Sequence, residues 1–227
     1  MNYEQARFNM IEQQIRPWEV LDSQILSLLA MVRREDFVPA ARKSLAFADM
    51  EIPLTAKPGQ TMLAPKVEAR MLQDLAVQKH EKVLEIGAGS GYMAALLAHR
   101  GQQVISMEID ADLAQLARDN LKKSGVFNAE VCTGDGASRL GQAASSNDPL
   151  SGPFDVIMLS GSVAEVPPAL LAMLKIGGRL GAIVGFKPVM RATLVTRIGE
   201  SDFRTTQNWD TVAARLLNFP EPSKFSF

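Results

Sequence analysis

The chain of 227 residues contains one cysteine, two histidines and almost no net charge. Its single cysteine, Cys132, excludes an intramolecular disulfide framework and a cysteine-based structural zinc site. The formal net charge of −1 gives no electrostatic footprint for nucleic acid or for an anionic membrane surface. We therefore expect neither a metal ion nor a nucleic acid among the ligands of this protein.

Long hydrophobic runs are missing as well. No apolar stretch reaches the roughly 20 residues that a membrane-spanning helix needs. The N-terminus carries acids and glutamines where a signal peptide would have a basic stretch and an apolar segment. We therefore expect a soluble, cytoplasmic protein without a membrane partner. Hydrophobic residues still make up 47% of the chain, so it can bury the core of one large domain.

After residue 65 the sequence alternates between short apolar stretches and amphipathic ones. Strands are expected at Lys82–Ile86, Gln103–Glu108, Ala129–Thr133, Phe154–Leu159 and Arg179–Val184. Helices are expected at Gly91–Arg100, Ala111–Ser124 and Pro168–Leu174. Strands that alternate with helices predict a parallel sheet covered on both faces. Two further strands, Ala192–Ile198 and Phe203–Trp209, are joined by a short turn and predict an antiparallel hairpin at the end.

The segment before this core has a different character. Helical spacing predicts one helix over Tyr3–Ile15 and a second helix capped by Asp22 or Ser23. Two prolines and a glycine between residues 52 and 59 predict an ordered but irregular loop. Pro65 then suits the first turn of another helix.

We interpret residues 1–227 as a single domain. In this interpretation, residues 1–64 form an N-terminal helical and substrate-loop segment, and residues 65–227 form the cofactor-binding core. Within the core, the stretch Ala137–Pro153 is rich in Gly, Ser, Asn and Pro, which predicts a surface loop.

A glycine turn follows the first predicted strand. Its glycines stand at Gly87, Gly89 and Gly91, and the residue where a dinucleotide fingerprint needs its third glycine is Tyr92. The acidic Glu85 just before the turn would repel a pyrophosphate, but it suits a ligand that carries an ammonium and a sulfonium group. The pattern therefore favours S-adenosylmethionine as the cofactor.

A series of motifs extends on both sides of this turn. In chain order they are Arg34-Glu35-Asp36-Phe37-Val38-Pro39, Phe47-Ala48-Asp49, Pro53-Leu54, Gly59-Gln60-Thr61, Gly91-Tyr92, Met107-Glu108, Gly134-Asp135-Gly136, Phe154-Asp155, Pro167-Pro168 and Leu174-Lys175-Ile176-Gly177-Gly178-Arg179-Leu180. Their order and spacing over about residues 3 to 185 resemble the protein-L-isoaspartate O-methyltransferase family.

The resemblance implies an α/β, Rossmann-like methyltransferase fold: a mostly parallel seven-stranded sheet with an antiparallel last strand and an N-terminal helical cap. It also implies methyl transfer from S-adenosylmethionine to the carboxylate of an isomerised aspartyl residue, in protein or peptide substrates, for protein repair. Such a carboxylate, with a pKa near ~4, is already ionised at neutral pH, so no general base is required. The enzyme has to align the reactants and exclude water.

The expected cofactor-binding residues surround the glycine turn and the ends of the next two strands. They are Glu85, Gly87, Ala88, Gly89, Ser90, Gly91, Glu108, Ile109, Asp135 and Gly136. Glu108 is expected to bind the ribose hydroxyls because it ends the second strand. The family resemblance implies that Asp135 faces the adenine. Each has a structural alternative, such as a tight strand–helix turn for the glycines or an Asp-Gly turn for Asp135.

The chain departs from the family pattern close to the expected acceptor. Family members typically read Gly-x-Thr-Ile-Ser-x-Pro, where the serine helps to position the substrate carboxylate, but this chain has Leu63 at that serine position. Leucine has no hydroxyl and cannot donate a hydrogen bond. Thr61 is the remaining hydroxyl of this motif, and Ser160 lies at the end of the fourth predicted strand. The candidate acceptor-site residues are Thr61, Leu63 and Ser160. Two alternatives stay open: a family member with a different acceptor, and a non-catalytic protein that binds S-adenosylmethionine.

Overall fold

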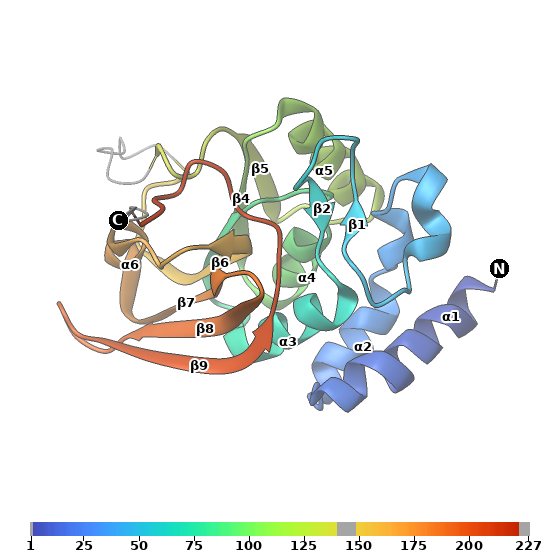
Figure 1. The fold of residues 1–227 in the computed structure, drawn as a ribbon, viewed down its shortest axis with the longest axis horizontal. Helices are drawn as coiled ribbons and strands as arrows, with labels where there is room; N and C mark the ends of the chain where they lie inside the picture. Colours follow the sequence, from blue (N-terminus) through green and yellow to red (C-terminus); the bar gives the residue numbers. More distant parts are fainter. Residues whose placement is uncertain (1, 140–148, 223–227) are drawn as a thin grey trace.

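The computed structural model describes residues 2–139 and 149–222, and its centre is a seven-stranded sheet (Figure 1). The strands are β3 (Lys82–Ile86), β4 (Gln103–Glu108), β5 (Ala129–Thr133), β6 (Phe154–Val163), β7 (Leu174–Phe186), β8 (Val189–Arg197) and β9 (Phe203–Thr211). Of the predicted surface loop 137–153, residues 140–148 lie outside the described residues.

The strand order is β5-β4-β3-β6-β7-β8-β9. Strands β5, β4, β3, β6 and β7 pair in parallel, whereas β8 is antiparallel to both of its neighbours. The prediction of a mostly parallel seven-stranded sheet that ends in an antiparallel hairpin is confirmed. After β5 the chain crosses to the other side of β3, so the direction of strand addition reverses between β3 and β6. Open α/β sheets bind ligands at such a switch point.

Irregular pairing between β6 and β7 was not predicted. Phe154 pairs with Leu174 and Val156 pairs with Arg179, so residues 175–178 form a bulge in β7. Gly177 and Gly178 lie in this bulge, and Gly177 has a φ of +86°, which glycine adopts without strain. The preceding helix, α6 (Pro168–Ala172), is two residues shorter than predicted because Leu174 already belongs to this strand.

Helices cover the two faces of the sheet unequally. On one face lie α3 (Pro65–Leu75), α4 (Tyr92–Arg100) and α5 (Ala111–Lys123), which share a hydrophobic cluster with strand residues such as Val83 and Val104. The next residues along the same strands, Leu84 and Ile105, point to the opposite face and pack with Leu170 of α6. Alternation along each strand thus supplies both faces with apolar side chains.

The N-terminal cap consists of α1 (Tyr3–Met10), which continues as a π-helical stretch through Ile15, and α2 (Ser23–Met31). Asp22 caps α2, as predicted, by accepting a hydrogen bond from the backbone N–H of Gln24 at 2.7 Å. The cap packs on the outer side of α3 and α4 (Figure 1).

Two very short strands, β1 (Ile52–Pro53) and β2 (Thr61–Met62), pair antiparallel next to the cap and were not predicted. Two residues each are too few to show an alternating pattern.

Arg34 joins the cap to the core. Its side chain is fully buried and forms an ion pair with Glu68 on α3. The same guanidinium donates to the carbonyl oxygen of Ala46 at 2.9 Å and to that of Leu63 at 2.6 Å, and it lies 5.0 Å from the centre of the Tyr92 ring. One side chain therefore binds three segments that are distant in sequence.

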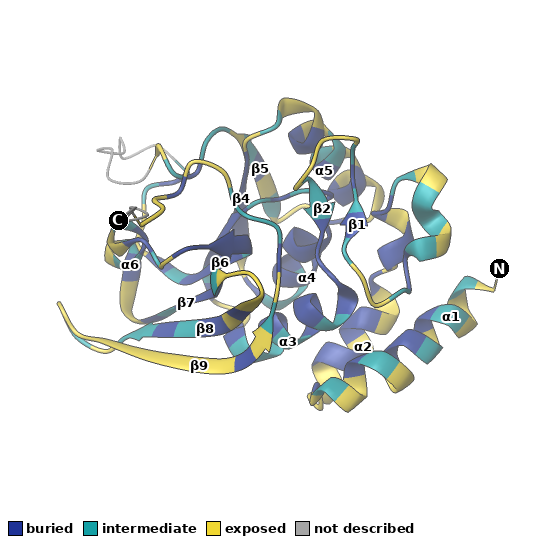
Figure 2. Ribbon diagram, viewed as in Figure 1, coloured by how far each residue is buried: buried dark blue, intermediate teal, exposed yellow. Residues whose placement is uncertain are grey.

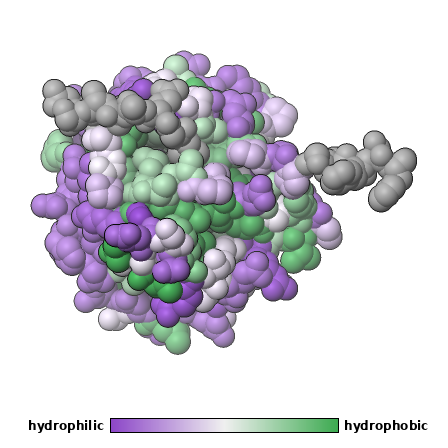
Figure 3. Space-filling model, turned by 90° about the vertical axis from the view of Figure 1, so that its left-hand side faces the viewer, coloured by the Kyte–Doolittle hydropathy of each residue, from purple (hydrophilic) through white to green (hydrophobic). Residues whose placement is uncertain are grey.

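Burial falls from the centre of the sheet to its last strand, as Figure 2 shows for β6 against β9. On the face that carries α6 and the end of the β8–β9 hairpin, hydrophobic residues gather in the middle and hydrophilic residues lie around them (Figure 3). Within residues 2–139 and 149–222, no helix has both the length and the apolar character needed to cross a membrane.

We predict that Arg34→Met lowers the free energy of unfolding by about 3 to 5 kcal/mol, because it leaves the buried Glu68 carboxylate without its partner. Urea unfolding measures this loss. Arg16→Met is the matched control: Arg16 pairs with Glu12 on the surface, and its loss should cost less than about 0.5 kcal/mol. Equal losses in the two variants would contradict a special role for Arg34.

Candidate cofactor and acceptor site

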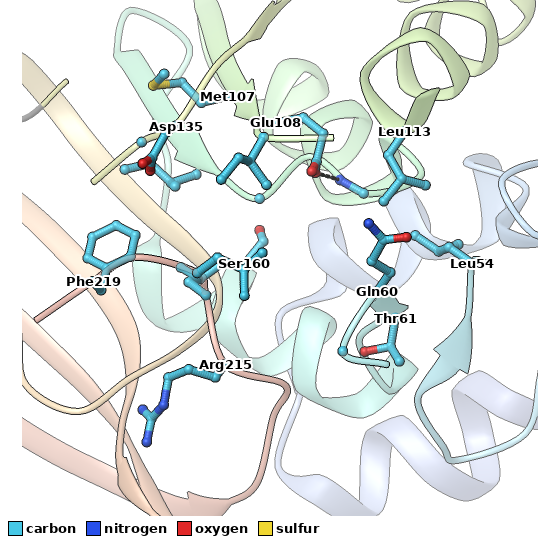
Figure 4. A pocket seen from close by; sticks show the side chains of 18 of the residues that line it. Leu54, Gln60, Thr61, Met107, Glu108, Leu113, Asp135, Ser160, Arg215 and Phe219 are labelled. Atoms are coloured by element: carbon cyan, nitrogen blue, oxygen red, sulfur yellow. Dashed lines mark hydrogen bonds between the residues drawn. The ribbon is translucent and has the colours of Figure 1, made fainter. Parts of the chain in front are cut away.

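A cavity opens at the carboxyl ends of β3, β4 and β6, at the switch point of the sheet. We call it the cofactor cavity. Its walls are formed by Leu54, Pro58, Gly59, Gln60, Thr61, Ile86, Gly87, Gly89, Met107, Glu108, Ile109, Leu113, Gly134, Asp135, Gly136, Ser160, Arg215, Leu216, Leu217 and Phe219. Figure 4 shows Gln60 and Thr61 on one side, Phe219 and Arg215 on the other, and Ser160 between them.

The glycine turn forms the floor of the cavity. The backbone N–H groups of Gly87 and Ala88 both donate to the carbonyl oxygen of Met107, at 2.8 and 3.0 Å, which fixes the turn against β4. Gly87 and Gly89 line the cavity. At Gly87, with a φ of +95°, a side chain would stand 3.0 Å from Leu216. The turn therefore lets backbone come close to a ligand.

The other residues of the turn lie behind the cavity wall. Gly91 packs against Ala117 of α5, where a side chain would come within 3.1 Å of backbone. The carbonyl oxygen of Ser90 accepts a hydrogen bond from Asn120 at 2.9 Å. Gly91, Ser90 and the buried Ala88 thus support the turn, and they are not part of the cavity lining.

Glu108, at the end of β4, faces the glycine turn. Its Oε2 accepts from the N–H of Gly89 at 2.8 Å (Figure 4). Its Oε1 accepts from the N–H of Asp110 at 3.1 Å. Each carboxylate oxygen keeps a further lone pair for a hydroxyl donor. Ile109 follows in the cavity wall. The arrangement suits the binding of adjacent hydroxyl groups.

Asp135 and Gly136 stand on the opposite wall, after β5. Asp135 accepts from the N–H of Ala137 and from Asn218, both at 2.9 Å, so it also holds the C-terminal segment, residues 212–222, in place. At Gly136 a side chain would lie 2.6 Å from Ile86, so glycine keeps the cavity open there.

Glu85 is fully buried beneath the cavity and does not line it. Its carboxylate accepts from the hydroxyls of Ser106 at 2.5 Å and Ser160 at 2.7 Å. Burial raises the pKa of Glu85 to about 7, although the two serine hydrogen bonds oppose the shift; the charge of Glu108 adds to it. Glu85 therefore reaches the cavity through Ser160, which does line it.

The three candidate acceptor residues separate into two groups. Thr61 and Ser160 line the cavity. The Oγ1 of Thr61 is buried and has no hydrogen-bond partner among the described residues. The side chain of Leu63 is 4% exposed and packs in the hydrophobic core, outside the cavity lining, while its carbonyl oxygen binds Arg34. The structure thus brings Thr61 and Ser160 together and places Leu63 apart from them.

Arg215 and Gln60 also line the cavity, but the sequence did not single them out. Arg215 donates to the carbonyl oxygen of Gly185 at 2.9 Å and pairs with Glu221 at 3.0 Å, while its Nη1 is buried without a partner among the described residues. Gln60 is the variable residue of the Gly59-Gln60-Thr61 motif. Arg215 reaches the cavity because the C-terminal segment pairs with Ser162 at the end of β6, and no local sequence pattern indicates that pairing.

A glycine turn, an acid after the second strand and a cavity at the switch point together define a Rossmann-like methyltransferase that binds S-adenosylmethionine. Residues 5–212 match the model of the protein-L-isoaspartate(D-aspartate) O-methyltransferase family. The chain belongs to this family, as the motif order predicted.

Relatives and solved structures agree with this assignment. A protein-L-isoaspartate O-methyltransferase of Koribacter versatilis is 40% identical over 84% of this chain and 81% of its own length. One of Rhodopseudomonas palustris is 36% identical over 94% and 96%. The fold resembles a Plasmodium falciparum protein described as a putative family member in complex with S-adenosyl-L-homocysteine, with a TM-score of 0.75, 18% identity and coverage of 95% and 98% of the two chains.

Glu108→Gln should weaken the binding of S-adenosylhomocysteine by about tenfold or more, because a charged acceptor for hydroxyl groups is lost. Isothermal titration calorimetry measures the dissociation constant. Glu130→Gln, on the neighbouring strand and outside the cavity lining, is the control and should leave it unchanged. An unchanged constant in Glu108→Gln would rule out a ligand contact at this carboxylate.

The raised pKa of Glu85 predicts a pH-dependent stability. Because the folded-state pKa of about 7 lies above the ordinary 4.5, the contribution of Glu85 to stability is present below about pH 4.5 and lost as the pH rises through about 7. From about pH 5 to pH 8, the free energy of unfolding should therefore fall by on the order of 2 kcal/mol more in the native chain than in Glu85→Gln. Urea unfolding across this range tests it, with Glu165→Gln, an exposed acid, as the control. Parallel pH curves for the native chain and Glu85→Gln would refute it.

Proposed function

We propose that this protein transfers the methyl group of S-adenosylmethionine to the carboxylate of an isomerised aspartyl residue in a protein or peptide, as its family assignment and cavity indicate. The observation that carries the acceptor assignment is Thr61. Thr61 lines the cavity, and its buried hydroxyl has no hydrogen-bond partner within residues 2–139 and 149–222; a buried donor without a partner is costly unless a ligand satisfies it.

The residues present suit the cofactor. The glycine turn admits close approach of a ligand, and Glu108 offers acceptors to the ribose hydroxyls. Apolar side chains of Leu54, Leu113 and Phe219 provide surfaces for an aromatic ring system. When bound, S-adenosylmethionine supplies an electrophilic methyl group on a sulfonium sulfur.

The acceptor would meet donors on two sides of the cavity. Thr61 belongs to the wall formed by the loop before α3, and Arg215 belongs to the wall formed by the C-terminal segment; Thr61 Oγ1 and Arg215 Nη1 are both buried without a partner among the described residues. A hydroxyl and a guanidinium are both donors, and a carboxylate is an acceptor with two oxygens. Together they can orient a carboxylate without the serine that the family motif has at position 63.

No side chain has to remove a proton from the acceptor. A carboxylate is ionised at neutral pH, so the protein contributes alignment and the exclusion of water. The walls of the cofactor cavity come from the loop before α3, from the sheet and from the C-terminal segment, so the reacting groups are enclosed from several sides (Figure 4). This sparse apparatus is consistent with methyl transfer to a group that is already nucleophilic.

The direct test is incubation with S-adenosylmethionine labelled in its methyl group and an isoaspartyl peptide, next to the same peptide with a normal aspartyl residue. We expect a base-labile methyl ester on the isoaspartyl peptide alone. Cofactor binding without any ester would favour a different acceptor or a binding protein without turnover.

Thr61→Val replaces the hydroxyl by a methyl group of similar size and should lower kcat/KM for the isoaspartyl peptide by about tenfold or more, the value of one hydrogen bond to a charged group. S-adenosylhomocysteine binding by the same variant serves as the control and should stay within about twofold. Thr196→Val, on β8 and outside the cavity lining, should leave kcat/KM unchanged. Full activity of Thr61→Val would remove Thr61 from the acceptor site.

A further inference from the structure

Asp110 stands between the cofactor cavity and the helix that follows it. Its Oδ1 caps α5 by accepting from the backbone N–H groups of Asp112 at 3.0 Å and Leu113 at 3.3 Å. Its Oδ2 is not needed for the cap and accepts from two other side chains: Lys57 Nζ at 2.6 Å and Gln60 Nε2 at 2.8 Å. One carboxylate therefore has a structural oxygen and an oxygen that binds a distant loop.

That loop, residues 54–61, is named the acceptor loop. Its ends are closed by a hydrogen bond from the N–H of Leu54 to the carbonyl oxygen of Gln60 at 2.8 Å. Inside it, the N–H of Lys57 donates to the Thr55 hydroxyl at 3.0 Å. These bonds make the loop one unit. Because Leu54, Gln60 and Thr61 all line the cofactor cavity, the position of the loop decides how far the cavity is closed.

The acceptor loop is also connected to the residue that binds the cofactor. The N–H of Asp110 donates to Glu108 Oε1, and the other oxygen of Glu108 accepts from Gly89 of the glycine turn. A continuous series of hydrogen bonds thus runs from the glycine turn through Glu108 and Asp110 to Gln60 and Lys57. A ligand that binds Glu108 therefore contacts a residue of this series.

We propose that Asp110 is a positioning residue that fastens the acceptor loop over the bound cofactor through Lys57 and Gln60, so that cofactor exchange requires these two bonds to open. The inference rests on the proposed function only where it assigns Thr61 to the acceptor. When the bonds are closed, Thr61 is held next to the cavity; when they open, the wall formed by Leu54 and Gln60 can move away from it.

The charges of Asp110 and Lys57 determine which solution condition weakens the contact between the acceptor loop and Asp110. Hydrogen bonds from Lys57 and Gln60 hold the pKa of the Asp110 carboxyl well below its usual range, and the same contact raises the pKa of Lys57. Both groups therefore stay charged across the neutral range, and pH does not open the contact. Lys57 is 67% exposed, so dissolved salt screens its attraction to Asp110. We therefore expect ionic strength, and not pH, to determine how often the contact between Lys57 and Asp110 opens.

The experiment measures how fast S-adenosylhomocysteine leaves the full-length protein, by displacement with excess unlabelled ligand. Asp110→Asn keeps an oxygen for the helix cap but loses the charge, and Lys57→Met removes the cation. Each should raise the dissociation rate by about three- to fivefold, the range that an exposed ion pair supplies. The double variant should be no faster than Asp110→Asn alone. Salt should raise the rate in the native chain and have little effect on the variants.

Lys175→Met is the matched control. It breaks an ion pair of similar geometry, Lys175 to Asp155 at 2.7 Å, that is not part of the cavity lining, and it should change neither the rate nor its salt dependence. Native dissociation rates in both Asp110→Asn and Lys57→Met would overturn the proposal, and so would an additive double variant.

The kinetic constants separate positioning from a purely structural role. If Asp110 positions the loop, Asp110→Asn raises the KM for S-adenosylmethionine at an unchanged melting temperature; a lower melting temperature at a native dissociation rate would show a helix cap and nothing more. Because the exchange measurement needs no acceptor, it succeeds or fails independently of the methylation assay.

Discussion

A guanidinium that leaves water must find acceptors for its N–H groups inside the protein, and the position of Arg34 depends on this requirement. It finds three acceptors: the carbonyl oxygen of Ala46 in the segment after the cap, the carboxylate of Glu68 on α3, and the carbonyl oxygen of Leu63 between the acceptor loop and α3. The cap and the acceptor loop are therefore tied to the same helix that packs on the sheet. The geometry of the cofactor cavity depends on this tie, because the acceptor loop forms one of its walls.

The opposite wall depends on the C-terminal segment, which lies along the end of β6. The backbone of Ser162 bonds to Ala214 at 2.7 Å and to Leu216 at 2.9 Å, which fixes Arg215 beside the cavity. Leu216 then packs on Gly87 and Gly161, so a side chain at either glycine would push this wall outward. The two walls thus come from segments that are far apart in the sequence, and the sheet between them carries Glu108 and Ser160 of the cavity lining.

Local patterns were enough to predict the strands, the glycine turn and the place of Glu108 at the end of β4, because each depends on neighbours within a few residues. They were not enough for contacts between distant segments. Gln60 and Asp110 are 50 positions apart, and nothing near either residue predicts that they share a hydrogen bond. Leu63 shows the same limit. Its motif position indicated an acceptor residue, but its buried side chain was visible only once the packing of the segment before α3 was known.

The burial of Leu63 changes how its departure from the family motif is understood. Its carbonyl oxygen binds Arg34, so the path of the backbone there is set by a contact that does not depend on the side chain. An apolar side chain at this position can therefore join the core while Thr61, two residues earlier, keeps its place in the cavity wall. For the proposed acceptor, the cavity still offers the hydroxyls of Thr61 from the acceptor loop and Ser160 from β6, and the side chain of Arg215 from the C-terminal segment.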